Sequence, residues 1–97
     1  MKPVIIDSEA ENELANSVAF YERRRLGLGL EFERAARNAV KYIQADPLRH
    51  PPQKEGTRRL IMERFPFILH YADLPSSIWI LAFAHTSRKP GYWRRRL

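Results

Sequence analysis

The chain has 97 residues, no cysteine and a formal net charge of +6. This length allows one domain with one modest core, and a hydrophobic content of 44% excludes disorder over most of the chain. Disulfides and thiolate metal sites are excluded, and the longest apolar run, Ile78 to Ala84, is far too short to span a membrane. We therefore expect one domain over residues 1–97 in the cytoplasm, with no membrane contact, cofactor, metal or small-molecule ligand.

The charge is unevenly distributed along the chain. The first thirteen residues contain four acidic residues, Asp7, Glu9, Glu11 and Glu13, and only one basic residue, Lys2. Their net charge is −3, so residues 14–97 carry +9. The last thirteen residues, HTSRKPGYWRRRL, contain five Lys or Arg, two adjacent aromatics and no acid. Such a bias favours a polyanionic partner, either nucleic acid or an acidic protein, although a basic protein without such a partner has the same composition.

The N-terminal part predicts a short strand followed by a helix. The β-type run at residues 4–6 ends at an aspartate, and Ser8 with Glu11 then forms a capping box. Apolar residues recur at positions 10, 14, 18 and 21, which gives one apolar stripe on a helix over about residues 8–25.

A second helix follows after a tight turn. Gly27-Leu28-Gly29 predicts the turn, and the apolar pattern from Phe32 to Ile43 predicts a helix that stops at Asp46-Pro47. Two amphipathic helices joined by so few residues form an antiparallel hairpin, and both apolar stripes need a common partner.

The C-terminal half predicts strands. A proline-rich loop over residues 47–57 precedes two segments of alternating apolar residues, 59–63 and 67–72, and residues 78–83 form a nearly all-apolar run. The element order is therefore β-α-α-β-β-β. This order predicts an α+β fold in which a helical hairpin packs on one face of a small twisted antiparallel sheet, with the first strand joining an edge.

We expect the sheet face opposite the hairpin to remain free as a working surface. On the last strand, Trp79, Leu81 and Phe83 are spaced by two, which predicts that they share one face in the core. His85 then leaves the sheet, and a basic tail over about residues 86–97 follows, whose arginines are expected to be disordered in the absence of a partner.

Several of these features follow one another in a recognisable order. The run RFPFILHYADLPSSIWILAFAHTSRKPGYW starts with Arg64 and two aromatics, continues through Tyr71 and the Ile-rich strand, and ends with His85-x-x-Arg88. This run resembles the C-terminal half of the RelE/ParE superfamily, the toxins of type II toxin–antitoxin modules. The N-terminal strand, the helix with Tyr21 near its end, the G-L-G turn and the second helix are similar to that family as well.

The resemblance implies a growth-inhibiting toxin, of the kind that stabilises plasmids, neutralised by an antitoxin whose acidic C-terminal segment wraps around it. Two activities are known in the superfamily. RelE-like members cleave mRNA at the ribosome without a metal, and ParE-like members inhibit DNA gyrase and are not regarded as nucleases. The chain would be an enzyme only in the first case.

A nuclease of this kind needs a base, a proton donor and cations at the phosphate. If the chain is RelE-like, the resemblance assigns this catalytic work to Arg64, His85, Arg88 and Tyr92. Further basic residues are expected to bind phosphate or a partner: Lys54, Arg58, Arg59, Arg94, Arg95 and Arg96. His70 alternates with core positions and is interpreted as a strand residue without a catalytic role, and His85 with Arg88 could equally hold the tail at the sheet edge.

Two departures from the RelE pattern favour the ParE-like branch. RelE-type nucleases commonly carry an arginine directly after the aromatic of the second meander strand, where this chain has Ile68 after Phe67. They also have several basic residues in the loop before the preceding strand. In this chain that loop contains only Lys54 before Arg58 and Arg59. A gyrase inhibitor is therefore the favoured prediction, with a ribosome-dependent mRNA endonuclease and a non-toxic nucleic-acid-binding domain as the alternatives.

Overall fold

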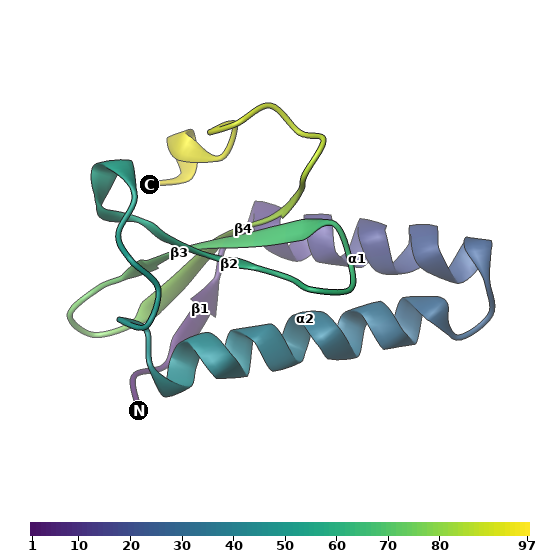
Figure 1. Cartoon of the computed structure of the whole chain (residues 1–97), viewed down its shortest axis with the longest axis horizontal. Coiled ribbons are helices and arrows are strands. Elements are labelled where there is room, and N and C mark those ends of the chain that lie inside the picture. Colours follow the sequence, from purple (N-terminus) through teal and green to yellow (C-terminus); the bar gives the residue numbers. More distant parts are fainter.

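The computed structural model describes residues 1–97 and has the predicted order of elements (Figure 1). These are β1 (Val4–Ile6), α1 (Ser8–Arg24), α2 (Leu28–Ala45), β2 (Arg58–Ile61), β3 (Phe67–Asp73) and β4 (Ile78–His85). Two short 3-10 turns are added, η1 (Lys54–Gly56) and η2 (Arg94–Arg96). The helical hairpin covers one face of the sheet, which confirms the α+β fold, and neither helix has the length and apolar character needed to cross a bilayer.

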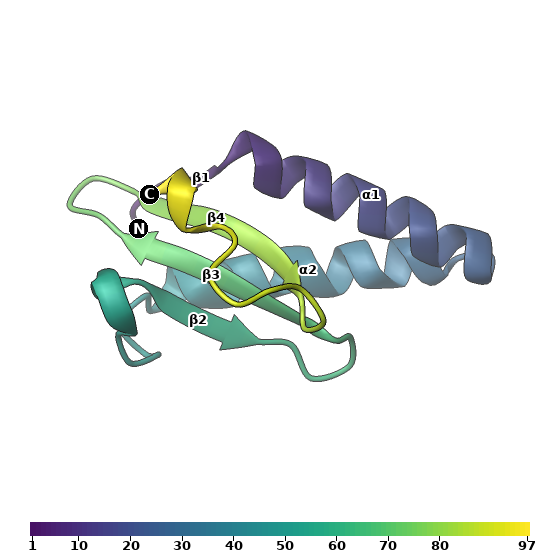
Figure 2. The ribbon, with the colours of Figure 1, turned by 90° about the horizontal axis from the view of Figure 1, so that it is seen from above.

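The sheet has the strand order β1-β4-β3-β2. The last three strands form the expected antiparallel meander, while β1 joins the edge of β4 in parallel, with Val4 opposite Ile78, so the sheet is mixed and not wholly antiparallel. The direction of β1 follows from the hairpin, because two helices return the chain to the end of the sheet where β1 began (Figure 2). The strand β2 therefore runs in the same direction as β1. Because β3 is antiparallel to both β2 and β4, β4 runs in that direction as well.

The two helices begin with side-chain caps that the sequence pattern did not identify. Asp7, and not Ser8, is the N-cap of α1, because its carboxylate accepts a hydrogen bond from the Glu9 backbone N–H at 2.9 Å and Ser8 is already helical. The predicted capping box of Ser8 and Glu11 is therefore wrong, and the cap is the single hydrogen bond to Asp7. At the start of α2 the Glu22 carboxylate accepts from the backbone N–H groups of Gly27 at 2.8 Å and Gly29 at 3.0 Å.

A β-bulge in β4 decides which side chains face the helices. Tyr71 lies opposite Ile80 and His70 opposite Ala82, so Leu81 is an extra residue on β4. The bulge leaves Phe83 in the core beneath the helices, with Phe32 and Leu69, whereas Leu81 packs on the other side of the sheet. The prediction that Phe83 shares a face with Trp79 and Leu81 is therefore wrong.

The face opposite the helices, here called the tail side, is partly covered by the chain's own C-terminus (Figures 1 and 2). Trp93 is only 5% exposed and packs in a small cluster with Leu81, Ala82 and Ala84 of β4. The segment after β4 is thus docked on the sheet and ends in the turn η2. This corrects the expectation of disordered tail arginines and of an entirely free second face.

Candidate functional site

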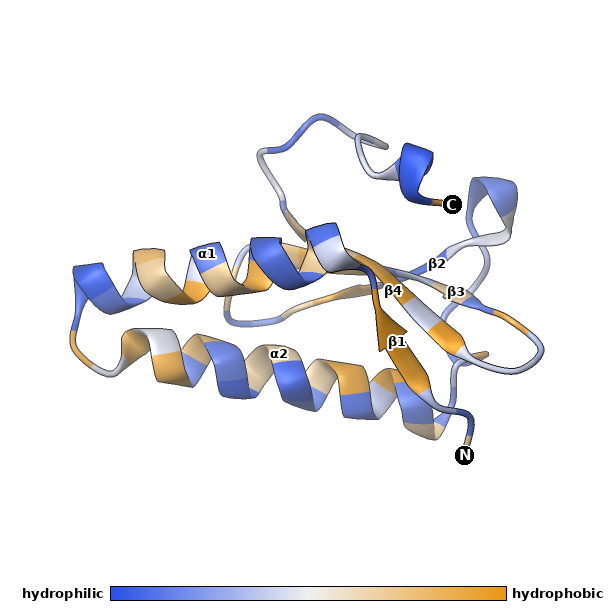
Figure 3. Ribbon diagram, turned by 180° about the vertical axis from the view of Figure 1, so that it is seen from behind, coloured by the Kyte–Doolittle hydropathy of each residue, from blue (hydrophilic) through white to orange (hydrophobic).

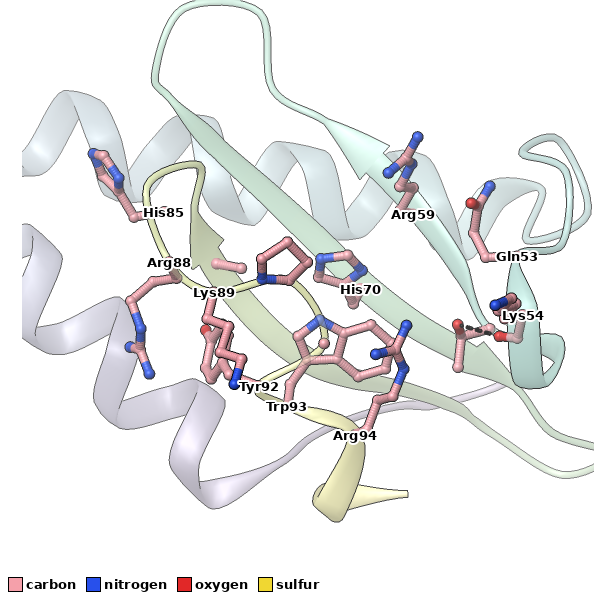
Figure 4. Close-up of a pocket in the computed structure, with 14 residues that line it drawn as sticks. Gln53, Lys54, Arg59, His70, His85, Arg88, Lys89, Tyr92, Trp93 and Arg94 are labelled. Carbon is pink, nitrogen blue, oxygen red and sulfur yellow. Dashed lines mark hydrogen bonds between the residues drawn. The ribbon is translucent and has the colours of Figure 1, made fainter.

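The docked tail and the sheet enclose a pocket of about 390 Å³ on the tail side (Figure 4). The sheet supplies Arg59 of β2 and His70 of β3, which are paired across the ladder. The loop before β2 contributes Gln53, Lys54 and Thr57, and the remaining walls are formed by the end of β4 and by the tail from Arg88 to Arg94. Three segments that are far apart in sequence therefore meet in one concave site.

The aromatic part of the pocket is a stacked pair. The rings of His70 and Trp93 are 4.4 Å apart between centroids with an interplanar angle of 26°. The pKa of His70 is lowered to about 4, mainly by burial and in part by the nearby positive charges of Arg59 and Arg94, against a smaller opposing effect of Glu13. His70 is therefore neutral near pH 7, and as a residue of strand β3 it also lines the pocket.

Five cationic side chains line the same pocket, namely Lys54, Arg59, Arg88, Lys89 and Arg94. Of these, only Arg94 has an ion pair, with Glu55 at 2.9 Å. Arg88 lies over the ring of Tyr92, with its guanidinium carbon 3.8 Å from the centroid. A concave site with four uncompensated cations suits an anionic group, either a phosphate or a carboxylate.

A partly buried acid on α1, Glu13, holds the tail in place by hydrogen bonds. The Glu13 carboxylate accepts hydrogen bonds from the Tyr92 hydroxyl at 2.5 Å, from the Arg96 guanidinium at 3.0 Å and from the Phe83 backbone N–H at 3.1 Å. Arg96 also donates to the Leu81 carbonyl at 2.9 Å. Since β1 pairs only with residues up to Ile80, Glu13 and Arg96 satisfy the backbone groups that the uncovered edge of β4 would otherwise leave free.

The contacts with Glu13 give two of the predicted site residues, Arg96 and Tyr92, a structural role. Arg96 has a side chain only 4% exposed and is paired with Glu13, so it holds the tail and is not available to a phosphate. Burial raises the pKa of Tyr92, and the hydrogen bond to Glu13 raises it further, so its hydroxyl stays protonated and committed to that carboxylate.

His85 stands at the exit of β4 with one ring nitrogen occupied. Its Nδ1 accepts a hydrogen bond from the Ser87 backbone N–H at 3.0 Å and lies 2.8 Å from the Ser87 hydroxyl. A backbone N–H can only donate, so the neutral ring carries its proton on Nε2. His85 thus presents a hydrogen-bond donor to its surroundings, and its ring packs edge-on against Phe67 at 5.1 Å.

The structure brings together six of the ten predicted site residues at this pocket: Lys54, Arg59, His85, Arg88, Tyr92 and Arg94. The other four lie elsewhere. Arg64 pairs with Glu31 of α2 at 2.6 Å, Arg58 donates to the His50 carbonyl at 2.5 Å, and Arg95 and Arg96 pair with acids of α1. The set proposed for catalysis is therefore divided, because Arg64 lies outside the pocket that the other three line.

Sequence reasoning missed Glu13, Trp93 and the pocket role of His70. The sequence did contain a signal for the role of Glu13. Glu9 and Glu13 are four residues apart and must lie on one helix face, and their negative charges are complementary to the arginines of the tail. No local pattern indicates that Trp93 stacks on His70, because this contact depends on how the tail folds back.

By its architecture the chain belongs to the class of small α+β domains in which a helical hairpin lies on a four-stranded mixed sheet, with a basic pocket on the opposite side. Neither a family model nor a curated protein matches the sequence. Among solved structures, the chain is similar to a chain of the chromosomal ParDE TA system from P. aeruginosa, with a TM-score of 0.75 and 22% identity. The similarity covers 88% of this chain and 96% of the other, and at this identity it establishes the fold.

Proposed function

We propose that the chain is the toxin of a type II toxin–antitoxin module and that it is ParE-like, acting by binding DNA gyrase without cutting RNA. The shared fold with a chain of a ParDE system over 88% of the sequence supports the toxin assignment. The observation that carries the choice of mechanism is that the acid–base groups near the pocket are already engaged in contacts of their own.

Each candidate for proton transfer is poorly suited to it. The Nδ1 atom of His85 is occupied by Ser87, and the Tyr92 hydroxyl donates to Glu13. A histidine with a pKa of about 4, as His70 has, is a weak base and is almost never protonated at neutral pH. The cations of the pocket can therefore bind an anion, but no free base stands beside them to activate a ribose hydroxyl.

Charge supports the proposed partner. An antitoxin segment rich in acids would be attracted to the basic side of the molecule, where four pocket cations lack a partner. The proposal thus assigns neutralisation to an acidic protein segment and inhibition to a contact with gyrase.

The proposal is tested by expressing the chain in a bacterial host with and without the neighbouring reading frame. We expect growth arrest with the chain alone and normal growth when a short partner with an acidic C-terminus is co-expressed. Harmless expression, together with salt-sensitive binding of the purified chain to RNA or DNA, would instead indicate a non-toxic nucleic-acid-binding domain.

The RelE-like alternative is favoured by one observation, the convergence of five cations on a pocket that contains a stacked aromatic pair. Primer extension on translated mRNA during growth arrest distinguishes the two mechanisms. Cuts in the ribosomal A site that vanish in His85→Ala or Arg88→Ala, but persist in the α2 surface variant Arg34→Ala, would establish the nuclease. We expect intact transcripts.

A further inference from the structure

The turn between α1 and α2 carries an exposed apolar group surrounded by arginines. We call this surface the hairpin tip and define it as Phe20, Arg23, Arg24, Arg25, Leu26 and Leu30. Leu26 is 89% exposed, Leu30 49% and Phe20 47%. The tip projects beyond the end of the sheet, and no strand covers it (Figures 2 and 3). The fold therefore leaves these apolar side chains in water with no internal packing role for Leu26.

The tip is held in one conformation. The Glu22 carboxylate binds the backbone N–H groups of both Gly27 and Gly29, and Gly27 takes the left-handed backbone that starts α2, with φ 87°. Gly29 lies so close to α1 that an added Cβ would be 2.4 Å from the Val18 carbonyl oxygen. Leu26 is thus presented from a fixed turn, and a partner would not have to order it.

The tip also has unbalanced positive charge. Arg23 and Arg24 have no acid within ion-pair distance, whereas Arg25 pairs with Glu31 at 3.3 Å. The acid nearest in sequence, Glu22, is occupied by the two backbone caps. A partner for this surface is therefore acidic, and a second copy of the chain is disfavoured because each copy carries +6.

The tip is continuous with the basic pocket. A second cavity of about 310 Å³ runs between α1 and the ends of β3 and β4, and Phe20 of the tip lines it. The same cavity is lined by His85 and Arg88, which also line the basic pocket. The second cavity therefore connects Phe20 of the tip with the basic pocket.

We infer that the hairpin tip is the surface with which the chain recognises its protein target, with Leu26 entering an apolar depression whose rim is acidic and lies against Arg23 and Arg24. This inference rests on the proposed function and names a contact surface for it. A protein target fits better than a lipid surface, because the apolar faces of both helices are buried on the sheet and only the turn remains for a membrane.

The test compares Leu26→Ser with Leu48→Ser, a matched control in the loop after α2 whose leucine is 63% exposed. Both variants remove one exposed leucine, so thermal melting should show the same fold in each. Binding of purified DNA gyrase to the immobilised chain and growth arrest on expression are measured side by side. We expect about ten-fold or more weaker binding and loss of arrest for Leu26→Ser only, because the burial of a whole leucine side chain changes affinity by about that factor.

A charge series completes the test. Arg23→Glu combined with Arg24→Glu should weaken gyrase binding, while Arg34→Glu combined with Arg37→Glu on α2 should leave it close to that of the original chain. Wild-type binding by Leu26→Ser, or equal losses in both leucine variants, would overturn the tip inference while leaving the proposed function intact.

The failures of the two proposals are distinguishable. If the original chain arrests growth but does not bind gyrase, the gyrase assignment is wrong, and the growth series of the variants still decides the role of the tip. If the chain binds phosphatidylglycerol vesicles through Leu26 and no protein, the inferred partner class is wrong. If the original chain neither arrests growth nor binds gyrase, both proposals fail.

Discussion

Glu13 connects three separate parts of the molecule. Its carboxylate receives donors from β4, from Tyr92 and from Arg96, so it joins α1, the sheet and the tail. The pocket depends on these contacts, because Trp93 and the tail cations are held over the sheet only while the tail is docked.

Replacing Glu13 with Gln should therefore destabilise the fold. The change removes the closer counter-charge of the Arg96 guanidinium, which is 4% exposed, and leaves it only Glu9 at 3.5 Å, so we expect the free energy of unfolding to fall by about 2–4 kcal/mol. Urea unfolding measures this. Glu11→Gln is the matched control, because Glu11 is 47% exposed in its contact with Arg37, and its loss should cost less than about 1 kcal/mol. Equal losses in both variants would contradict the central role of Glu13.

His70 predicts a pH dependence of stability. Its pKa is about 4 in the folded chain and 6.5 as its ordinary value, so between these pH values the unfolded chain binds a proton that the folded chain does not. The stabilisation is complete above about pH 6.5 and is lost as the pH falls towards 4. We expect His70 to contribute about 2 kcal/mol to this loss, after allowance for its partial exposure.

The measurement is urea unfolding at pH values from 7 to 4.5, with His70→Phe as the reference variant. Phenylalanine keeps an aromatic ring against Trp93 but does not titrate, so the variant should lose less stability than the original chain over this range. Parallel curves for the two proteins would show that His70 is not buried in its neutral form as described.

At the scale of the elements, the closeness of α1 and α2 depends on Gly29. A Cβ at this position would meet the Val18 carbonyl oxygen at 2.4 Å and the Glu22 Cβ at 2.9 Å, and a backbone carbonyl cannot move away unless the helices separate. Gly29→Ala should therefore lower the free energy of unfolding by about 1–3 kcal/mol, despite the better helix propensity of alanine. Asn38→Ala on the exposed side of α2 should be neutral or slightly stabilising in the same thermal or urea melts.

The helices and strands are also the features that the sequence predicted best. Periodicity predicted both helices and the strands β2 and β3, because a half-buried helix or strand must repeat its apolar residues at 3.6 or 2, and apolar runs predicted β1 and β4. The bulge at Leu81 could not be predicted in this way. Apolar residues lie on both faces of β4, so its sequence does not indicate where the alternation shifts by one residue.

At the scale of the whole molecule, the candidate site was only partly predictable. The basic residues of the tail and of β2 are visible in the sequence, and six of the predicted residues do line one pocket. The sequence did not indicate that Arg64, Arg95 and Arg96 form ion pairs within the chain, because the acids that they meet lie on α1 and α2, far away in sequence. Which acid each arginine meets depends on how distant segments pack, the tail against α1 for Arg95 and Arg96 and the β2–β3 connection against α2 for Arg64, and local patterns do not encode this packing.

Inhibition of DNA gyrase by the purified chain tests the central claim most directly. Relaxed plasmid, gyrase and ATP are mixed with increasing amounts of the chain, and supercoiling is followed on gels. A ParE-like toxin that works through contact with its target predicts dose-dependent loss of supercoiling, while translated mRNA exposed to the same preparation stays intact. Full supercoiling at saturating concentrations of the folded chain would contradict it.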